Sequence, residues 1–593
     1  MANLPEANLP EAYLPKGGSY LLGVTAPQNI FTPEDFEDEH RMIGETVSRF
    51  LAERVFPRME ELDAKKDGLM RELLVEAGEL GLLGADIPEQ YDGTETDEIC
   101  STIIAEKMGA AGSFAITHGG HSGIGNLPIV YFGNEAQKAR YLPSIVTAEK
   151  VSAYALTEPG SGSDALSAKT KAVLSADGKH YILNGGKTFI SNAGMADIFI
   201  VYAKIDGEKF SAFIVDGNSA GLTTGAEEKK MGLKGSSTRS VYFENVQVPV
   251  ENLLFEAGKG HVVAFNILNI GRHKVAANAV GAAKFALDLS AGYANERKQF
   301  KVPIAQFGLI KEKLAEMAVR IYAAESAVYR TGGLLTEMMH SLDRSGPDGG
   351  QVTARGIEEY ALECSLEKVF ASEVEAYAVD EGVQIHGGYG FIAEYPIERL
   401  YRDARIRRIF EGTNEINRNL IPTTLLRRAA KGAIPLLETI KDLNTRIAGT
   451  IAMRKNPDDM VQAAKDIFLF VMGVAYDKYG DNLLKEQEVL GRLADMAIYA
   501  YTMESAWLRA QKSAGNGQSG ASHKTNMATA FIYTAVEKLS RAGQEILAAL
   551  ATGGKLVKMQ ADLAQLLQYN AIDIIGLRRD IAQEISVAGK YVA

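Results

Sequence analysis

Hydrophobic residues recur at helical spacing over most of the chain and at strand spacing in one internal stretch. Thr32 can cap a helix, Pro33 suits the first helical position and Asp35 lies three residues after the cap, so the sequence predicts a helix start there. Helical periodicity then continues to about residue 150. Between Val151 and Pro249 the apolar runs are short and alternate, which predicts β-strands. Three turn pairs predict hairpins in this stretch: Asp177-Gly178, Asn184-Gly185 and Asp206-Gly207.

The changes of period divide the chain into five predicted segments. Prolines recur every five residues near the N-terminus and forbid regular helix, so we expect an extended arm that is docked on a neighbour or disordered. After the β segment the pattern becomes helical again and stays so to the end. The predicted segments are an arm (1–31), a helical domain (32–150), a β domain (151–260), a helical bundle (261–426) and an appended helical domain (427–593), with residues 514–520 as a flexible linker by composition.

Composition narrows the classes of partner and compartment. The 593 residues carry a net charge of −12, which argues against a nucleic acid as the main partner. Only two cysteines are present, Cys100 and Cys364, so neither a disulfide framework nor a cysteine-based metal site is expected. The first 20 residues have no basic or apolar segment of a secretory signal. We therefore expect a cytoplasmic protein, with peripheral contact to the inner face of a membrane as the alternative.

A glycine-rich segment imitates a dinucleotide-binding fingerprint. Gly160-Ser161-Gly162-Ser163-Asp164-Ala165 matches G-x-G-x-x-A, but that fingerprint requires a strand followed by a helix. Here both flanking segments, 151–156 and 169–174, have strand patterns, so a loop between strands is predicted. The structural alternative is a plain turn. The hydroxyls and glycines of this loop instead favour close backbone approach to a ligand.

Two segments resemble signatures of the acyl-CoA dehydrogenase family. The first runs from Tyr154 through Thr157-Glu158-Pro159-Gly160 to Asp164, and the second joins Gln384-Ile385-His386-Gly387-Gly388 to Phe410-Glu411-Gly412-Thr413. The resemblance covers roughly residues 35–425, and the overall length is similar to the very-long-chain branch. It implies a mostly α fold with a central β-barrel domain, a four-helix bundle and an appended C-terminal helical domain.

The resemblance also implies a reaction and a base. Family members remove the α-proton and the β-hydride of an acyl-CoA, with FAD as the hydride acceptor and a trans-2-enoyl-CoA as product. Glu411 matches the catalytic glutamate of the family; by spacing alone it could equally be a surface carboxylate at a helix start. Some relatives place the base on another helix, where this chain has Gly271, which cannot serve. That difference favours Glu411.

The resemblance assigns FAD contacts to both halves of the chain. Phe189 stands where tryptophan is often found, and Phe307-Gly308 replaces a frequent Phe-Gln, which puts one FAD hydrogen bond in doubt. Arg297 would pair with the pyrophosphate from the other subunit of a dimer, although a solvated helix residue is the alternative. The implied set is Tyr154, Leu156, Thr157, Gly162, Ser163, Phe189, Ile190, Ser191, Arg297, Phe300, Gln384, Gly387, Gly388 and Thr413.

Substrate contacts are implied at fewer positions. Arg272 is the better candidate for CoA by its charge, whereas Asn269 replaces an aspartate of some relatives and its role stays open; Ser163 and Gly412 complete the set. The glycine-rich segment 118–125 would border the acyl chain and leave room for a long tail. Close helix packing is the equally weighted alternative. His118 and His121 lack the spacing and companions of a metal site, and no metal is expected.

The appended domain begins with an amphipathic helical pattern. Leu436, Leu437, Ile440, Leu443, Ile447 and Ile451 form one apolar face with basic residues around it. Such a helix can lie on an anionic membrane or face a protein core. The core-facing alternative carries somewhat more weight.

The leading functional hypothesis is FAD-dependent dehydrogenation of a fatty acyl-CoA, with long chains favoured, in fatty-acid β-oxidation. Electrons would pass to an electron-transfer flavoprotein, and the protein would be a homodimer or homotetramer. An acyl-CoA oxidase that uses oxygen is one alternative. A non-catalytic flavoprotein of the same fold, used in assembly or binding, is another.

Overall fold

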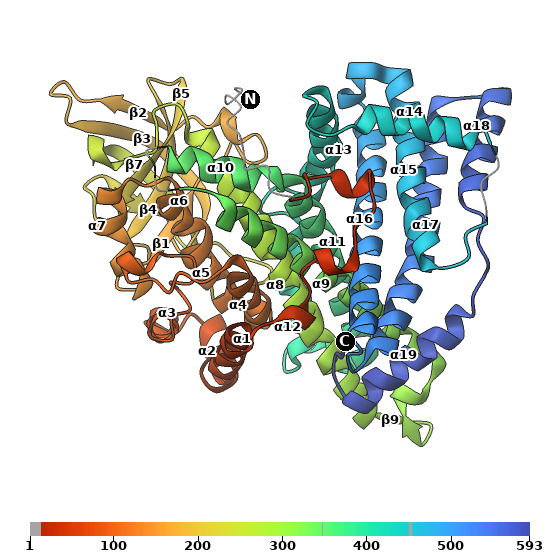
Figure 1. Ribbon diagram of the computed structural model, residues 1–593. Helices are drawn as coiled ribbons and strands as arrows, with labels where there is room; N and C mark the ends of the chain where they lie inside the picture. The colour runs from red at the N-terminus through yellow and green to blue at the C-terminus, as the bar shows by residue number, and fades with distance from the viewer. Residues whose placement is uncertain (1–13, 345, 347, 450–452) are drawn as a thin grey trace. The chain divides into compact units, whose positions relative to one another are not determined.

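The computed structural model describes residues 14–344, 346, 348–449 and 453–593. The proline-containing repeat of the predicted arm (residues 3–12) lies outside this range. Two compact units are present (Figure 1). Unit 1 is formed by Phe36–Gly281 and Leu335–Glu358, and unit 2 by Leu14–Asp35, Ala282–Leu334 and Glu359–Ala593. Two long helices, α8 (Gly260–Glu296) and α9 (Gly308–Ser341), contribute residues to both units.

Unit 1 begins with a helical layer around an apolar core. The predicted helix start, with Thr32 as cap and Pro33 as first residue, is wrong by five residues: the Asp35 carboxylate accepts hydrogen bonds from the Thr32 N–H and hydroxyl, which closes a short 3-10 turn, and α1 starts at Asp38 after the cap Glu37. The helices are α1 (Asp38–Phe50), α2 (Met59–Asp63), α3 (Leu69–Glu79), α4 (Glu98–Met108), α5 (Ser113–Gly119), α6 (Leu127–Phe132), α7 (Glu135–Val146) and α10 (Gly349–Glu359).

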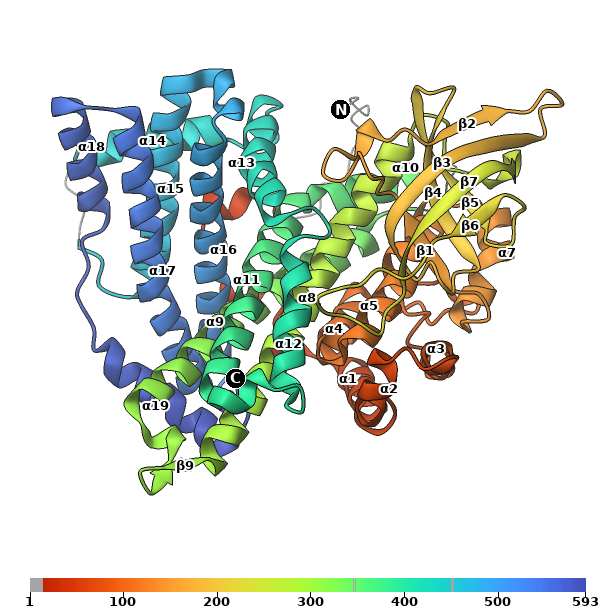
Figure 2. The same ribbon diagram turned by 180° about the vertical axis from the view of Figure 1, so that it is seen from behind.

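The strands of unit 1 form one mixed sheet. Its strands are β1 (Ser152–Ala155), β2 (Lys171–Leu174), β3 (His180–Ser191), β4 (Ile198–Ile205), β5 (Lys209–Asp216), β6 (Leu222–Thr224), β7 (Thr238–Pro249) and β8 (Leu253–Leu254). Their order is β6-β7-β3-β2-β4-β5-β8, with β1 parallel to β4 (Figure 2). The predicted barrel is therefore corrected to an open sheet. Its end strands, β6 and β8, have three and two residues, too few to pair along a common edge and close it.

The three predicted hairpin turns have different outcomes. Asp206 and Gly207 both have positive φ, 53° and 80°, and join β4 to β5 as a type I′ turn requires. Asp177-Gly178 joins β2 to β3 as predicted. Asn184-Gly185 is instead a bulge within β3, where the register to β7 shifts. At Gly185 a Cβ would lie 2.8 Å from the Thr170 Cα, so close packing against the residue that precedes β2 explains this glycine.

Unit 2 is a bundle of long helices. Besides parts of α8 and α9 it contains α11 (Ala361–His386), α12 (Pro396–Ala404), α13 (Asn414–Ala430), α14 (Leu436–Ile447), α15 (Pro457–Tyr479), α16 (Gln487–Gly515), α17 (Ala521–Leu550), α18 (Gly553–Leu566), α19 (Ile574–Ala588), and the short strands β9 (Lys298–Gln299) and β10 (Val302–Pro303). The predicted linker at 514–520 is the turn that joins α16 to α17, and hydrogen bonds within it make it compact. The appended region thus packs as part of the bundle.

Residues 14–35, which include the described part of the predicted arm (14–31), dock onto their own chain in unit 2 (Figure 1). Backbone N–H groups of Gly17 and Gly18 donate to the carboxylates of Glu359 (2.9 Å) and Glu363 (2.7 Å). Further along, the Tyr20 hydroxyl donates to the Ala497 carbonyl of α16 at 3.0 Å. A Cβ at position 17 would lie 2.0 Å from the Glu359 carbonyl oxygen, so this approach requires glycine.

A buried charge network secures this segment. The Arg509 guanidinium on α16 donates to both carboxylate oxygens of Glu34 (2.8–3.0 Å) and to Glu325 on α9 (2.7 Å). Lys524 on α17 lies 2.8 Å from Glu34, and the Tyr591 hydroxyl donates to Glu325 at 2.8 Å. Both ends of the described chain therefore meet the same guanidinium site.

The amphipathic helix α14 turns its apolar face inward. Leu436, Ile440, Leu443 and Ile447 are buried, and Ile440 lies against Gly473 of α15. Leu437 is partly exposed, and Ile451 lies outside the described residues. Of the two interpretations of this helix, the one in which its apolar face is turned to the protein core therefore fits the structure. In the part of the chain that the structure describes, no helix combines the length and apolar content that crossing a membrane requires.

Acid should weaken unit 2 through Glu34. Burial opposes ionisation, but Arg509 and Lys524 lower the pKa of Glu34 from 4.5 to about 2. The resulting stability, about 3 kcal/mol, is complete above the unfolded pKa and is lost as pH falls from about 4.5 towards about 2. Glu34→Gln should reduce stability at pH 7 and flatten its dependence on pH in that window. Urea unfolding followed by fluorescence of Trp507, the one tryptophan, measures this; exposed Glu438→Gln is the control, and an unchanged pH profile would contradict the assignment.

Candidate functional site

The glycine-rich loop of unit 1 starts at the end of a buried strand. Tyr154 and Leu156 are buried, and Tyr154 packs edge-on against Tyr202 at a ring distance of 5.1 Å. The loop then exposes Gly162 and Ser163 and passes through a 3-10 turn to β2. It lies between strands, as predicted, so no helix N-terminus follows the glycines. At Gly160 and Gly162 no atom lies within 4 Å of where a Cβ would be, and a ligand can approach this backbone.

A buried ion pair that the sequence analysis missed holds this loop. The Lys187 ammonium donates to Glu158 at 2.7 Å and to the Leu156 carbonyl at 3.1 Å. Backbone N–H groups of Lys169 and Thr170 also donate to the Glu158 carboxylate, and together these bonds lower its pKa against the effect of burial. Burial lowers the pKa of Lys187 to about 8. The pair fixes both ends of the loop to β3.

The next residues of β3 present an aromatic surface beside the loop. The Thr188 N–H donates to the Thr157 carbonyl at 2.9 Å, so the two segments are adjacent. Phe189 follows with φ of 57° and a side chain that is 64% exposed. A left-handed phenylalanine is strained and persists only where the surrounding structure fixes it. Ile190 packs into the sheet core, and Ser191 is half-buried, so Phe189 carries the exposed side chain of this predicted wall.

The predicted CoA-contacting residues of α8 pair with each other. The Arg272 guanidinium donates to the Asn269 side-chain oxygen at 2.7 Å, and both side chains are buried in unit 1. Their spacing of three residues puts them on one helix face. Asn269 thus orients Arg272, which an aspartate at this position could also do.

Glu411 lies in unit 2 immediately before α13. It has φ of 54°, and Gly412 follows with φ of 80°. Two successive left-handed residues, the first of them not glycine, form a strained turn that persists only where the surroundings fix it. Thr413 caps α13, with its hydroxyl accepting from the Ile416 N–H at 3.3 Å. The Glu411 side chain is half-buried at the end of this turn.

Two buried side chains hold the Glu411 turn. The Asn417 amide donates to the carbonyls of Glu411 (3.4 Å), Gly412 (2.8 Å) and Thr413 (3.1 Å). The Lys368 ammonium on α11 donates to the Gly412 carbonyl at 2.9 Å. Neither residue was predicted, although Asn417 lies six positions after Glu411 on the helix that the turn begins.

The other predicted residues of unit 2 gather where α8 ends. The Arg297 guanidinium lies 5.5 Å from the centre of the Tyr389 ring, which directly follows Gly387 and Gly388. Gln384 and both glycines are exposed. Phe300 occupies the turn between β9 and β10 and is 88% exposed, with φ of 50°. The structure therefore brings together a guanidinium, exposed glycine backbone and exposed aromatic rings.

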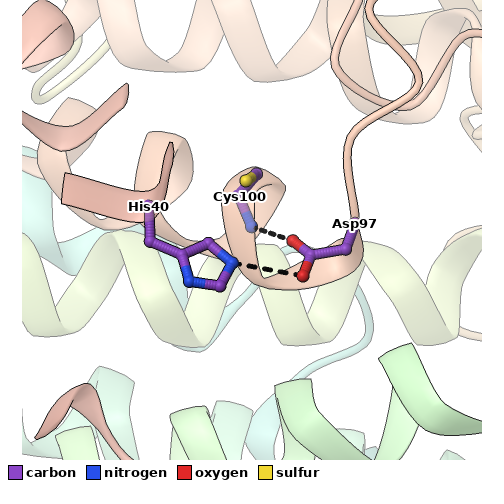
Figure 3. Close-up of side chains that lie close together, drawn as sticks. All are labelled: His40, Asp97 and Cys100. Atoms are coloured by element: carbon purple, nitrogen blue, oxygen red, sulfur yellow. Dashed lines mark hydrogen bonds and ion pairs between the residues drawn. The ribbon is translucent and has the colours of Figure 1, made fainter. Parts of the chain in front are cut away.

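One group in unit 1 has donor atoms at metal-binding distances: His40, Asp97 and Cys100 (Figure 3). Its hydrogen bonds are those of two helix caps. Asp97 caps α4 by accepting from the Cys100 N–H at 2.8 Å, and His40 accepts from the Glu37 N–H at 3.1 Å while its other ring nitrogen contacts Asp97 at 3.2 Å. Burial raises the pKa of the Cys100 thiol, which disfavours the thiolate that a metal needs. Helix capping accounts for this cluster.

His118 and His121 are likewise occupied within unit 1. Each ring donates from Nε2 to a backbone carbonyl oxygen, that of Leu82 for His118 and that of Ile145 for His121, at 3.0 Å. Burial lowers the pKa of both to about 4, so both are neutral at pH 7. His118 thus ties α5 to the loop after α3, and His121 ties its segment to α7 and, by accepting from the Ser152 N–H at 3.1 Å, to β1.

Comparison with known proteins identifies the family. The matching descriptions are "Acyl-CoA dehydrogenase, N-terminal domain" for residues 37–149, "middle domain" for 153–246, and "C-terminal domain" for both 258–426 and 463–565. A probable acyl-CoA dehydrogenase of Bacillus subtilis is 49% identical over 97% of this chain and 98% of its own. The chain belongs to the acyl-CoA dehydrogenase family, as its two signature segments indicated.

Two further relatives refine this placement. The very long-chain specific acyl-CoA dehydrogenase of Rattus norvegicus is 35% identical over 84% of this chain and 80% of its own. A Bacillus anthracis acyl-CoA dehydrogenase, solved as a complex with FAD, superimposes with a TM-score of 0.95 at 52% identity and covers 98% of this chain and all of its own. The predicted resemblance to the very-long-chain branch, with its additional C-terminal domain, is confirmed.

The Glu158–Lys187 pair yields a stability prediction. Lys187→Met should leave Glu158 buried without its cation and destabilise unit 1 by about 3–5 kcal/mol. Calorimetry should show a lower melting temperature, and limited proteolysis should show faster cleavage in the loop at 157–164. Lys171→Met, on the exposed face of β2, is the matched control and should change stability by less than about 0.5 kcal/mol. Equal melting temperatures for the two variants would refute the role of the pair.

Proposed function

We propose that this protein catalyses α,β-dehydrogenation of a long-chain fatty acyl-CoA to the trans-2-enoyl-CoA in fatty-acid β-oxidation, and passes electrons to an electron-transfer flavoprotein. The observation that carries the proposal is the fixed Glu411–Gly412 turn in a chain of the acyl-CoA dehydrogenase family. The two free, buried cysteines are consistent with a reducing compartment such as the cytoplasm.

FAD is the cofactor that the family and the exposed residues fit. The Bacillus anthracis relative is complexed with FAD. In unit 1 the exposed ring of Phe189 can stack on a planar ring system, and the open backbone at Gly162 can donate to it. In unit 2 the exposed Arg297 suits a pyrophosphate, and the open backbone at Gly387 and Gly388 suits close approach of the adenosine half. When bound, FAD supplies the acceptor for the hydride from the substrate β-carbon.

The chain itself supplies the base and the polarising groups. Glu411 takes the weakly acidic α-proton, which requires a carboxylate held in one direction. Its backbone N–H donates to the thioester carbonyl oxygen and stabilises the negative charge that develops there. The left-handed turn and its hydrogen bonds fix this N–H and the carboxylate together. Arg272, oriented by Asn269, binds the CoA portion.

Oligomer formation is supported by the surface of unit 2. Phe300 and Phe391 are 88% and 85% exposed, and large exposed aromatic side chains usually mark an interface. We assign this surface to a second copy of the chain. Arg297 would then reach a cofactor held mainly by the partner, and the protein would be at least a homodimer.

Flavin bleaching tests the reaction. Anaerobic addition of saturated acyl-CoAs of increasing length to the FAD-loaded protein should bleach the flavin, fastest with long chains. Glu411→Gln should slow bleaching at least about 10³-fold while FAD stays bound, because it removes the base. Bleaching at the parental rate in this variant would exclude Glu411, and no bleaching at any chain length would exclude the substrate class. Rapid oxygen consumption without an added acceptor would favour the oxidase alternative.

The glycines at 119–125 test chain-length preference. No atom lies within 4 Å of where a Cβ would be at Gly119, whereas at Gly125 a Cβ would lie 2.4 Å from the Ser152 hydroxyl. If Gly119 borders the acyl chain, Gly119→Leu should leave the melting temperature unchanged and lower kcat/KM for long chains about 10-fold or more relative to short ones. Gly125→Ala, a close-packing position, should lower the melting temperature instead. An unchanged length profile in folded Gly119→Leu would contradict the assignment.

A further inference from the structure

The turn that carries Glu411 is held from the α11 side by one buried cation. Lys368 is fully buried, and its ammonium donates at 2.9 Å to the Gly412 carbonyl and at 2.9 Å to the Asn414 side-chain oxygen. The Gly412 carbonyl belongs to the peptide that directly follows the turn. Burying an ammonium group costs free energy. If position 368 only had to fill space, a methionine of similar length would do so without that cost. The position of the ammonium therefore points to a role for its charge and direction.

Asn414 continues the contact outward. Its amide nitrogen donates to the Glu373 carboxylate at 3.1 Å, and Glu373 accepts two parallel hydrogen bonds from Arg418 at 2.8 and 3.0 Å. The remaining edge of that guanidinium donates to Asp495 of α16 at 2.7 Å. Asp495 lies in the appended region, which shorter chains ending at α13 would lack. An unbroken series of polar contacts thus joins α16 to the turn within unit 2.

The strained backbone of the Glu411 turn requires contacts that hold it, and this series of polar contacts supplies them. Left-handed φ at Glu411 costs of order 1 kcal/mol or more and is kept only by surrounding contacts. Asn417 fixes three carbonyls from inside α13, but it moves with that helix. Lys368 belongs to a different helix, α11, and Asp495 holds α13 to α16. The direction of Glu411 is therefore set against the bundle and not only against its own helix.

We propose that Lys368 is a positioning residue for Glu411, and that the appended region secures it through Asp495, Arg418, Glu373 and Asn414. The inference rests on the proposed function, in which Glu411 is the base. It gives the appended helices a part in the chemistry in addition to their packing. Lys368 then affects proton removal by Glu411 separately from any effect that it has on folding.

The test compares Lys368→Met with Lys465→Met in the FAD-loaded protein. Lys465 is an equally buried lysine of unit 2 that donates to the Gly23 carbonyl at 2.7 Å and pairs with Glu504, away from the turn. Both variants should lose stability. Only Lys368→Met should lower kcat, by about 10- to 100-fold, with KM nearly unchanged and a larger isotope effect for α-deuterated acyl-CoA, since misplacing the base slows proton removal. A kcat within twofold of the parent would overturn the proposal.

A double variant shows whether Lys368 acts through Glu411. Glu411→Gln with Lys368→Met should be no slower than Glu411→Gln alone, whereas a further loss equal to that of the single Lys368 variant would overturn the proposal. Full activity of Glu411→Gln would instead refute the proposed function. The two failures are distinguishable, because the first is measured in Glu411→Gln and the second in the variants of Lys368. If Lys368→Met does not fold, Asp495→Asn tests the same series of contacts at a partly exposed position, where a substitution disturbs folding less. We expect its kcat to be about two- to tenfold lower at unchanged KM. An unchanged kcat there would overturn the part assigned to the appended region.

Discussion

A guanidinium buried away from water must be neutralised where it lies, and Arg509 imposes that requirement on unit 2. Its partners come from three distant parts of the chain: Glu34 before α1, Glu325 on α9 and, through Glu325, Tyr591 near the end. If the segment with Glu34 left, Arg509 would lose one of its two carboxylate partners, and if Tyr591 left, the buried Glu325 would lose a hydrogen bond. The same helix, α16, carries Asp495, which pairs with Arg418 of α13, the helix that the proposed catalytic turn begins.

The same principle acts on a smaller scale near the functional residues. Lys187 in unit 1 and Lys368 in unit 2 are fully buried ammonium groups that donate to backbone carbonyls, Leu156 and Gly412 respectively. Each carbonyl adjoins a loop that presents exposed or strained backbone. A lysine can reach such a carbonyl from a neighbouring element and hold it in a fixed direction, which water on a flexible loop cannot do.

Periodicity predicted the order of helical and β segments, because the spacing of apolar residues records which face is buried. A signature segment contains Glu411, and the family resemblance as a whole pointed to Phe189 and Arg297; the family comparisons bear out that resemblance. Other features have no local signal. Asn184-Gly185 has the composition of a turn, yet the approach of Thr170 makes it a bulge. Barrel closure depends on the lengths of two end strands, and the partners of Lys187 and Lys368 lie 29 or more residues away.

The docking of residues 14–35 has a consequence for synthesis. Glu34 emerges from the ribosome 475 residues before Arg509, which at about 5–20 residues per second means a delay of roughly half a minute or more. During that time its carboxylate stays in water, while most of unit 1 is already complete. Unit 2 closes only when α16 and the C-terminal residues arrive. Completion of the chain is thus coupled to closure of the bundle, and a nascent protein that stops short of α16 leaves Glu34 without Arg509, although Gly17 and Gly18 can already bond Glu359 and Glu363.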